Sequence, residues 1–210
     1  MELTATFFWE PLLAAAGSAD APATSRLESD EALMLRYRDG DEAAFRSLYL
    51  RYRAPLMRFS QRLTGRASEA EEIFQETWMA VIDSRARYSV RAKFVTWLFA
   101  IAHRRAADSM RRLARRPVQN TADNALLVES HPDSADHQPP DIVLADERAR
   151  ALRMAIAALP FAQREVFLLR AETGLGVREI AAITHARPEA TKSRLRYALR
   201  QLSKAMSAWN

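Results

Sequence analysis

Basic side chains crowd into the stretch "KFVTWLFAIAHRRAADSMRR", residues 93–112. Guanidinium and ammonium groups at this density attract phosphates, which predicts a track for a nucleic-acid backbone. Trp97 and Phe99 lie among these charges, and aromatic rings beside basic residues suit stacking on unpaired bases. The apolar spacing of the same stretch also fits one buried helix face, so Trp97 is alternatively a core residue.

A second basic stretch, "PEATKSRLRYALRQLSKAM", follows the short segment "VREIAAIT" after the three residues "HAR". Two helices so closely joined, the second long and basic, predict a DNA-reading helix-turn-helix. Arginine binds guanine bidentately, and lysine and serine hold phosphates or base edges. A solvated basic helix is the alternative, and His185 stands where such turns often have Gly. The candidate DNA-contacting residues are Lys192, Ser193, Arg194, Arg196, Tyr197 and Arg200.

Acidic side chains recur in "SEAEEIFQETWMAVI", residues 68–82. Paired carboxylates can serve acid–base catalysis or hold a metal, but no nucleophile–base pair or cluster of metal ligands accompanies them. We therefore expect no enzymatic activity, no metal and no cofactor. A solvated acidic face and a docking surface for a basic protein both remain possible readings. Ser68 and Glu71 predict a capping box at the start of this helix.

The bulk composition favours a polyanionic partner. The chain has 210 residues, a formal net charge of +5 and 49% hydrophobic residues, so it can build cores while remaining basic. Nucleic acid and an anionic membrane surface are both compatible with that charge. No apolar run reaches membrane-spanning length, so we expect no membrane insertion. The chain has no Cys, which fits a reducing, cytoplasmic setting.

The elements that must position these residues are helical, and the chain is predicted to be all-α. Residues 29–116 form a first small domain, in which Ser29 and Asp41 are N-cap candidates. Residues 117–140 contain no Lys or Arg and are rich in Asp and Pro, which predicts a flexible acidic linker. Residues 141–210 form a second domain with the helix-turn-helix. Residues 1–28 are expected to be a disordered or weakly docked extension.

The order of these pieces resembles the extracytoplasmic-function (ECF) group of bacterial RNA polymerase sigma factors. The segments "DEAAFRSLYLRYRAPLMRFSQRLTG", "AEEIFQETWMAVI" and "FVTWLFAIAHRRAADSMRR" look like the three parts of its first domain. The segments "ALPFAQREVFLLR" and "VREIAAITHARPEATKSRLRYALRQL" look like its second domain. Each piece alone is weak evidence, but five in the right order are strong evidence.

The resemblance implies a transcription initiation factor that binds core bacterial RNA polymerase and promoter DNA. The family's counterpart of residues 69–83 binds the clamp helices of the largest polymerase subunit, which assigns that role to Glu71, Glu72, Gln75 and Glu76. The counterpart of residues 188–203 reads the −35 element. The counterpart of residues 93–112 binds and helps melt the −10 element, which points to Lys93, Trp97, His103, Arg104, Asp108, Arg111 and Arg112.

The chain also departs from the family. Arg104 stands where Asn is frequent, Thr191 where Val is frequent, and Tyr197 where a basic residue is frequent. The promoter preferences of relatives therefore do not transfer to this chain. By analogy alone, control by a separate protein such as an anti-sigma factor is expected. The alternative function is a stand-alone helix-turn-helix regulator that binds a two-fold symmetric operator as a dimer.

Overall fold

The computed structural model describes residues 28–115 and 140–207, and in these ranges every regular element is helical. The expected extension up to residue 27 and nearly all of the expected linker lie outside the described residues. The helices are α2 (Asp30–Arg38), α3 (Glu42–Thr64), α4 (Ala67–Ser84), α5 (Phe94–Arg115), α6 (Pro140–Ala157), α7 (Phe161–Thr173), α8 (Val177–Ile183) and α9 (Pro188–Ala205), with a 3-10 turn at Arg85–Arg87. The expected all-α fold is confirmed.

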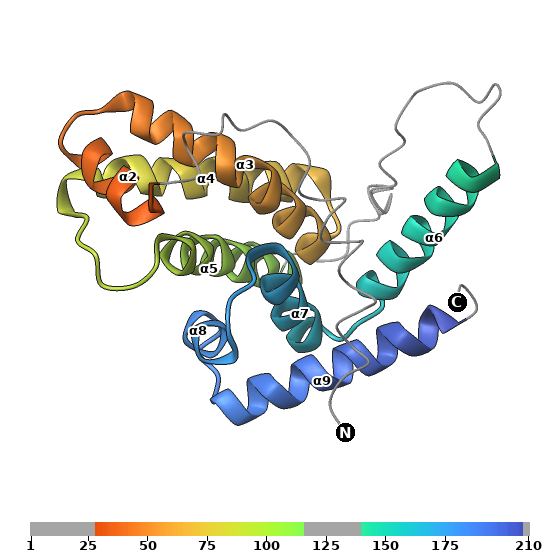
Figure 1. Cartoon of the computed structure of the whole chain (residues 1–210). Helices are drawn as coiled ribbons and strands as arrows, with labels where there is room; N and C mark the ends of the chain where they lie inside the picture. Colours follow the sequence, from red (N-terminus) through yellow and green to blue (C-terminus); the bar gives the residue numbers. More distant parts are fainter. Residues whose placement is uncertain (1–27, 116–139, 208–210) are drawn as a thin grey trace.

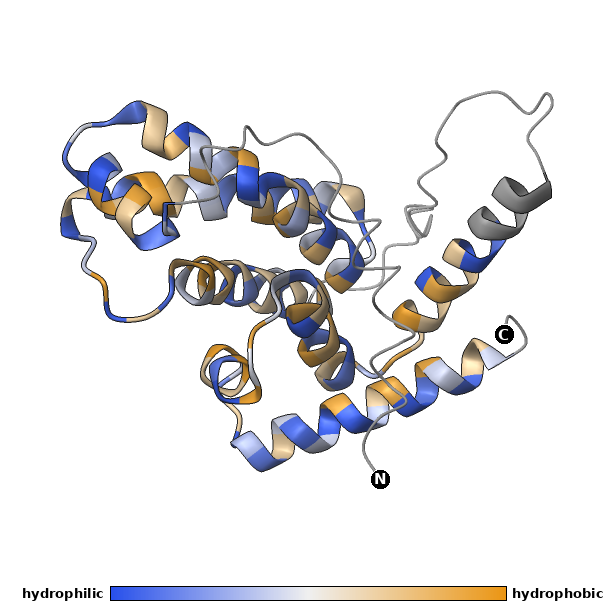
Figure 2. Cartoon of the chain, viewed as in Figure 1, coloured by the Kyte–Doolittle hydropathy of each residue, from blue (hydrophilic) through white to orange (hydrophobic). Residues whose placement is uncertain are grey.

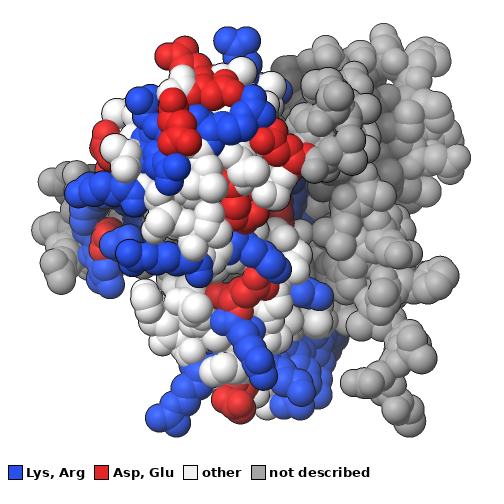
Figure 3. Space-filling model, turned by 60° about the vertical axis from the view of Figure 1, so that its left-hand side comes forward, with Lys and Arg blue, Asp and Glu red and all other residues white. Residues whose placement is uncertain are grey.

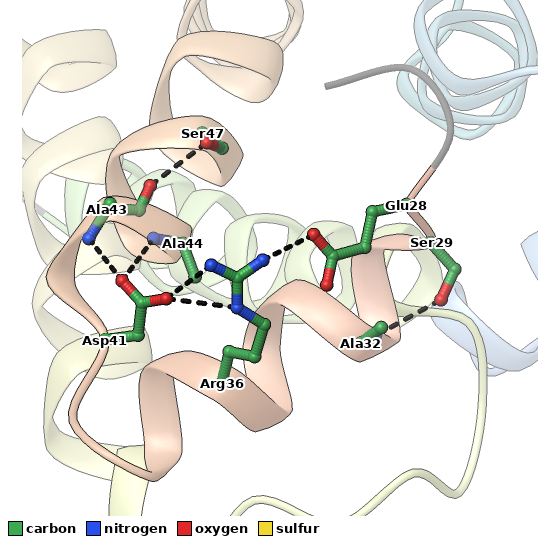
Figure 4. A network of polar contacts seen from close by, with 8 residues as sticks. All are labelled: Glu28, Ser29, Ala32, Arg36, Asp41, Ala43, Ala44 and Ser47. Atoms are coloured by element: carbon green, nitrogen blue, oxygen red, sulfur yellow. Dashed lines mark hydrogen bonds and ion pairs between the residues drawn. The ribbon is translucent and has the colours of Figure 1, made fainter. Parts of the chain in front are cut away.

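The first two helices begin as the sequence predicts. The Ser29 hydroxyl accepts a hydrogen bond from the backbone N–H of Ala32 at 3.2 Å and caps α2. The Asp41 carboxylate accepts from the N–H groups of Ala43 and Ala44 and caps α3. Arg36 bridges Glu28 and Asp41, so one guanidinium links both helix starts (Figure 4). The hydrogen bond from Arg36, together with those from the Ala44 and Ala43 N–H groups, lowers the pKa of Asp41.

The start of α4 differs from the prediction. Ser68 does not cap this helix, because α4 begins at Ala67, two residues earlier than predicted, and the N-cap position falls on Arg66 without a side-chain cap. The Ser68 hydroxyl instead donates to Glu69 at 3.0 Å, and Arg66 pairs with the same carboxylate. The expected Ser68–Glu71 capping box is therefore wrong. The left-handed Gly65 (φ 74°) ends α3 and brings the chain directly into α4.

Helices α2 to α5 pack into one bundle, here called the N-terminal bundle (Figure 1). Its fully buried side chains include Phe59, Phe94 and Phe99. Phe59 and Phe99 meet edge to face, with ring centroids 5.4 Å apart, an arrangement that aromatic rings favour. Apolar and polar residues alternate along these helices (Figure 2), and most of the large apolar side chains are buried, whereas Leu50, Met79 and Ile82 are exposed. The bundle thereby fixes the direction of α5.

Helices α6 to α9 form the C-terminal bundle, in which α9 packs against α6, α7 and α8. The turn between α8 and α9 confirms the predicted helix-turn-helix. His185 in this turn has φ 51°, the left-handed conformation that glycine adopts without strain. The Ala186 N–H closes the turn on the Ala181 carbonyl at 3.0 Å. Pro188 opens α9 at a position where its missing N–H costs nothing.

The two bundles are in contact. Helix α7 packs along α3, and α8 packs against α5. The buried apolar side chains of both bundles belong to one continuous cluster. No helix in residues 28–115 or 140–207 is long and apolar enough to cross a membrane.

We expect Ser29→Ala to lower the free energy of unfolding by about 1 kcal/mol, because α2 loses its N-cap. Ser68→Ala is the matched control and should change stability by less than about 0.5 kcal/mol. Urea denaturation of both variants measures the difference. Equal losses would mean that the Ser68 hydroxyl does cap α4.

Candidate nucleic-acid interface

Most of the predicted −10 residues share one side of α5. At about 100° per residue, Trp97, Arg104, Asp108 and Arg111 fall on one stripe, with Arg112 beside it. The three arginines are exposed. Arg111 pairs with Asp108 one turn away, and this hydrogen bond lowers the pKa of Asp108. Arg104, Arg111 and Arg112 outnumber the one acidic residue, Asp108, so this side of α5 carries a net positive charge.

The start of α5 is held by a residue that sequence reasoning missed. Lys93, at the N-cap position, has no acceptor to offer the helix, and the first turn contains no acidic residue. Glu31 of α2 supplies the acceptor instead, taking the Phe94 N–H at 2.6 Å. Arg85, in the turn after α4, lies 5.1 Å above the ring centre of Tyr37, another α2 residue. Helix α2 therefore positions the basic loop of residues 85–93.

Trp97 is half-buried, and its ring packs between Tyr88 and Phe94 at centroid distances of 5.2 and 5.8 Å. Burial, with the nearby charges of Glu31 and Asp30, raises the pKa of Tyr88 to about 12, so its phenol stays protonated at neutral pH. Trp97 thus combines core packing with partial exposure. The expectation that Phe99 stacks on bases is wrong, because its ring is fully buried.

The basic face of α9 is built around an aromatic ring. Lys192, Arg196 and Arg200 are exposed, whereas Thr191, Ala198 and Leu202 are buried. The guanidinium groups of Arg196 and Arg200 lie 5.6 and 5.8 Å from the ring centre of Tyr197, within cation–π range. Ser193 is half-buried at the edge of this face. Basic side chains gather at the lower end of the molecule in Figure 3, the end at which α9 lies in Figure 1.

The acidic residues of α4 lie beside the arginines of α5. Glu72 pairs with Arg112 at 3.1 Å, and Glu76 approaches Arg105 at 3.5 Å. Glu71, Glu72 and Gln75 are exposed, while Ile73 and Val81 enter the core. Three of the four predicted docking residues are therefore exposed on the side of α4 away from the core, and Glu76 is half-buried beside Arg105.

Two of the residues predicted to contact DNA, His103 and Arg194, do not lie on the exposed faces of α5 and α9. His103 lies about 120° around α5 from the Trp97 stripe, and Arg194 lies about as far around α9 from Arg200. Both turn toward Glu165 of α7: His103 Nε2 is 2.9 Å from Oε2, and Arg194 Nη1 is 3.6 Å from Oε1. His103 and Glu165 are both buried. The structure therefore separates His103 and Arg194 from the other predicted DNA contacts and joins them to one carboxylate.

Further ion pairs cross between the bundles. The Glu172 carboxylate of α7 accepts hydrogen bonds from Arg58 Nε and Arg62 Nη1 of α3, each at 2.9 Å. The Glu172 side chain is only 4% exposed. Lys93 Nζ lies 3.0 Å from the Glu179 carboxylate of α8. The Gly176 N–H and then Lys93 lower the pKa of Glu179. The roles of the buried acids Glu165 and Glu172 were not predicted from the sequence, because their arginine and histidine partners are distant in the chain.

The described residues contain no group of three or more His, Asp or Glu side chains placed to hold a metal ion. Of the carboxylates above, Glu31, Glu72, Glu165 and Glu172 are each engaged by a basic side chain or a backbone N–H. These carboxylates pair with basic side chains or N–H groups of neighbouring helices, and the pairs hold the helices in position. The chemistry that this arrangement supports is binding to phosphates, bases and a protein surface.

Comparison with known families agrees with this arrangement. Residues 48–116 match the family Sigma-70 region 2, and residues 149–202 match Sigma-70, region 4. The ECF RNA polymerase sigma factor SigF of Caulobacter vibrioides is 35% identical over 180 residues, covering 84% of this chain and 93% of that protein. The ECF RNA polymerase sigma factor RpoE of Cereibacter sphaeroides is 37% identical over 179 residues, covering 84% and 94%.

Solved structures share the fold. The sigma factor RpoE of Bartonella quintana, in complex with the anti-sigma factor NepR, superposes with a TM-score of 0.59 at 20% identity, covering 78% of this chain and 96% of that one. CnrH, in complex with the cytosolic domain of CnrY, superposes with a TM-score of 0.60 at 20% identity, covering 86% and 99%.

We expect Glu31→Ala to destabilise the protein by about 1 kcal/mol, because α5 loses the acceptor at its first turn. The loop of residues 85–93 should also become more sensitive to trypsin, which cleaves after its arginines. Thermal melting and timed digestion measure the two effects, with Glu147→Ala, an exposed residue of α6, as the control. Loop cleavage at the wild-type rate would show that Glu31 does not hold the loop.

Proposed function

Because the chain belongs to the ECF family of RNA polymerase sigma factors, we propose that it directs core bacterial RNA polymerase to a subset of promoters. In this role the exposed stripe of α5 and the loop before it bind the −10 element and help melt it. Helix α9 reads the −35 element in the major groove. The exposed acidic side of α4 docks on the polymerase clamp.

One observation carries the proposal: a single chain holds two separate basic helix faces of different construction. The α5 face combines exposed arginines with the half-buried Trp97, a combination that suits phosphates and unpaired bases. The α9 face follows a helix-turn-helix turn and is narrow and basic, which suits duplex DNA. A factor that both recognises a duplex and captures a separated strand needs both surfaces.

The stand-alone regulator is not favoured. It would leave the N-terminal bundle as a sensor or dimerisation unit, yet this bundle carries its own basic track and matches Sigma-70 region 2.

We place the chain's action with the polymerase in the cytoplasm, and the chemistry of RNA synthesis belongs to the polymerase. Control by an anti-sigma factor is proposed by analogy with the complexes of the structural relatives.

Run-off transcription tests the proposal directly. Purified core bacterial RNA polymerase is given a genomic fragment library with and without this protein. New transcripts that require both components support a sigma factor, and their upstream sequences reveal both promoter elements. Operator-like binding by the protein alone, without new transcripts, would support the regulator instead.

We expect Arg196→Ala to reduce transcription in a way that depends on the −35 sequence, because a bidentate base contact contributes about 1–3 kcal/mol of discrimination. Transcription from a set of −35 variants measures the effect. An equal loss on every variant would mean that Arg196 contacts only phosphate.

We expect Glu72→Lys combined with Gln75→Ala to weaken binding to core polymerase, because both side chains are exposed on the proposed docking side and the lysine repels a basic partner. A competition assay against the wild-type protein measures the affinity. Glu147→Lys in α6 makes the same charge change elsewhere and should bind normally. Unchanged affinity of the double variant would remove α4 from the docking surface.

A further inference from the structure

Two neighbouring acids, Asp30 and Glu31, lie in the first turn of α2, beside the surface proposed for the −10 element. We propose that Glu31 is a positioning residue for the capture of unpaired bases. Its carboxylate fixes the first turn of α5, and with it the Trp97 ring and the basic loop of residues 85–93. The inference rests on the function proposed above, and it gives α2 a part in DNA melting without contact with the DNA.

The first turn of α5 depends on Glu31 because its own sequence offers no cap. The first N–H groups of a helix have no partner within the helix. Lys93 precedes α5, and the lysine side chain has no acceptor for these groups. Glu31 supplies the acceptor from 63 residues away, with its Oε1 atom 2.6 Å from the Phe94 nitrogen. A carboxylate at this end of α5 is also favoured by the positive end of the helix dipole.

Asp30 fixes the place from which Glu31 acts. The Asp30 carboxylate accepts hydrogen bonds from Arg51 and Tyr52 of α3, and its side chain is 18% exposed. Burial and the hydrogen bond to Asp30 raise the pKa of Tyr52, so its phenol remains a donor at neutral pH. The first turn of α2 is therefore bound to α3 through Asp30 and to α5 through Glu31.

Glu31 also lies near the rings that support Trp97. The Trp97 ring packs between Tyr88 and Phe94, and Phe94 packs on Tyr52 with ring centroids 5.5 Å apart. Burial, and then the nearby charge of Glu31, raises the pKa of the Tyr88 phenol. This phenol oxygen is buried and has no hydrogen-bond partner in the part of the chain that the structure describes. Ring packing therefore fixes Tyr88, and the packing depends on the position of Phe94.

The loop before α5 is anchored at both ends, with its exposed residues between the anchors. Tyr88 is 8% exposed at one end, and Phe94 is fully buried at the other. Residues 89–93 between them are all exposed, and the Val90 side chain is 52% exposed. Because both ends are fixed, this exposed segment keeps one place beside Trp97. The anchor at Phe94 is the one that Glu31 holds through the backbone N–H.

Loss of this anchor should affect the binding of unpaired bases more than the binding of duplex DNA. The exposed arginines Arg104, Arg111 and Arg112 lie seven or more residues beyond Trp97, or about 10 Å or more at about 1.5 Å per residue. Fraying at a helix end is confined to its terminal turn, so their phosphate contacts should persist. Stacking on a base requires the Trp97 ring, whose N–H bonds back to the Lys93 carbonyl at the start of the helix.

The inference is tested by measuring the affinity of two DNAs for core polymerase loaded with Glu31→Ala. One DNA is the unpaired non-template strand of a −10 element recovered by run-off transcription. The other is the same promoter as a duplex, at a low temperature that keeps it closed. Glu31→Ala should raise the Kd for the single strand about tenfold, the contribution of one hydrogen bond to a charged group, and change the Kd for the duplex less than about twofold.

Two further variants separate positioning from general stability. Glu31→Gln keeps an oxygen acceptor for the Phe94 N–H and should bind the single strand within about threefold of the wild type, since it loses only the charge. Asp41→Ala removes the N-cap of α3 at the other end of α2, which lowers stability by a similar amount. It leaves the first turn of α5 intact and should bind both DNAs as the wild type does.

Hydrogen exchange of the amides in the first turn of α5 tests the structural premise without polymerase or DNA. Glu31→Ala should exchange these amides faster than the wild type and than Asp41→Ala. If the wild-type protein with core polymerase binds neither DNA, the proposed function fails, while exchange still decides whether Glu31 holds this turn. If Glu31→Ala does not fold, Glu31→Asp keeps the charge, withdraws the acceptor and is judged by the same measurements.

Three results would overturn the inference. An equal loss of affinity for both DNAs would show that Glu31 only supports the fold. Wild-type affinity of a folded Glu31→Ala variant for the single strand would show that Trp97 and the loop do not depend on Glu31. Exchange at the wild-type rate would show that the carboxylate does not hold the first turn of α5.

Discussion

The structure depends on the two-sided character of helix α5. Its apolar residues, such as Phe94, Leu98 and Phe99, are fully buried against the rest of the N-terminal bundle, and this burial fixes both the axis and the rotation of the helix. Because the rotation is fixed, Arg104 and Arg111, two turns apart, are exposed on the same side of the helix. The same constraint turns His103 away from that side and toward the C-terminal bundle.

Charge is organised by pairing across the molecule. The chain is basic overall, yet several acidic side chains lie against arginines of other helices, as Glu72 does against Arg112 and Glu172 against Arg58. Exposed pairs of this kind contribute little stability, whereas a carboxylate without water requires a partner. The exposed pairs therefore shape the binding surfaces, and the buried ones determine which helices remain in contact.

Much of the fold could be predicted from local patterns. The caps at Ser29 and Asp41, the stop at Gly65 and the inward face of α9 follow from neighbours a few residues apart. Contacts across long sequence separations could not be predicted. Glu31 reaches Phe94 over 63 residues, and Glu165 reaches His103 over 62. The Ser68 prediction failed for a local reason, since Gly65 ended α3 so close to α4 that the N-cap position fell on Arg66.

The ring of Tyr197, with Arg196 and Arg200 beside it, has an entropic consequence for recognition. A free arginine side chain loses up to about 2 kcal/mol of rotamer freedom when it is fixed. Here part of that freedom is already lost in the unbound protein, because both guanidinium groups rest against one rigid ring. The α9 surface therefore meets DNA partly preorganised, and a smaller share of the contact energy is spent on ordering its side chains.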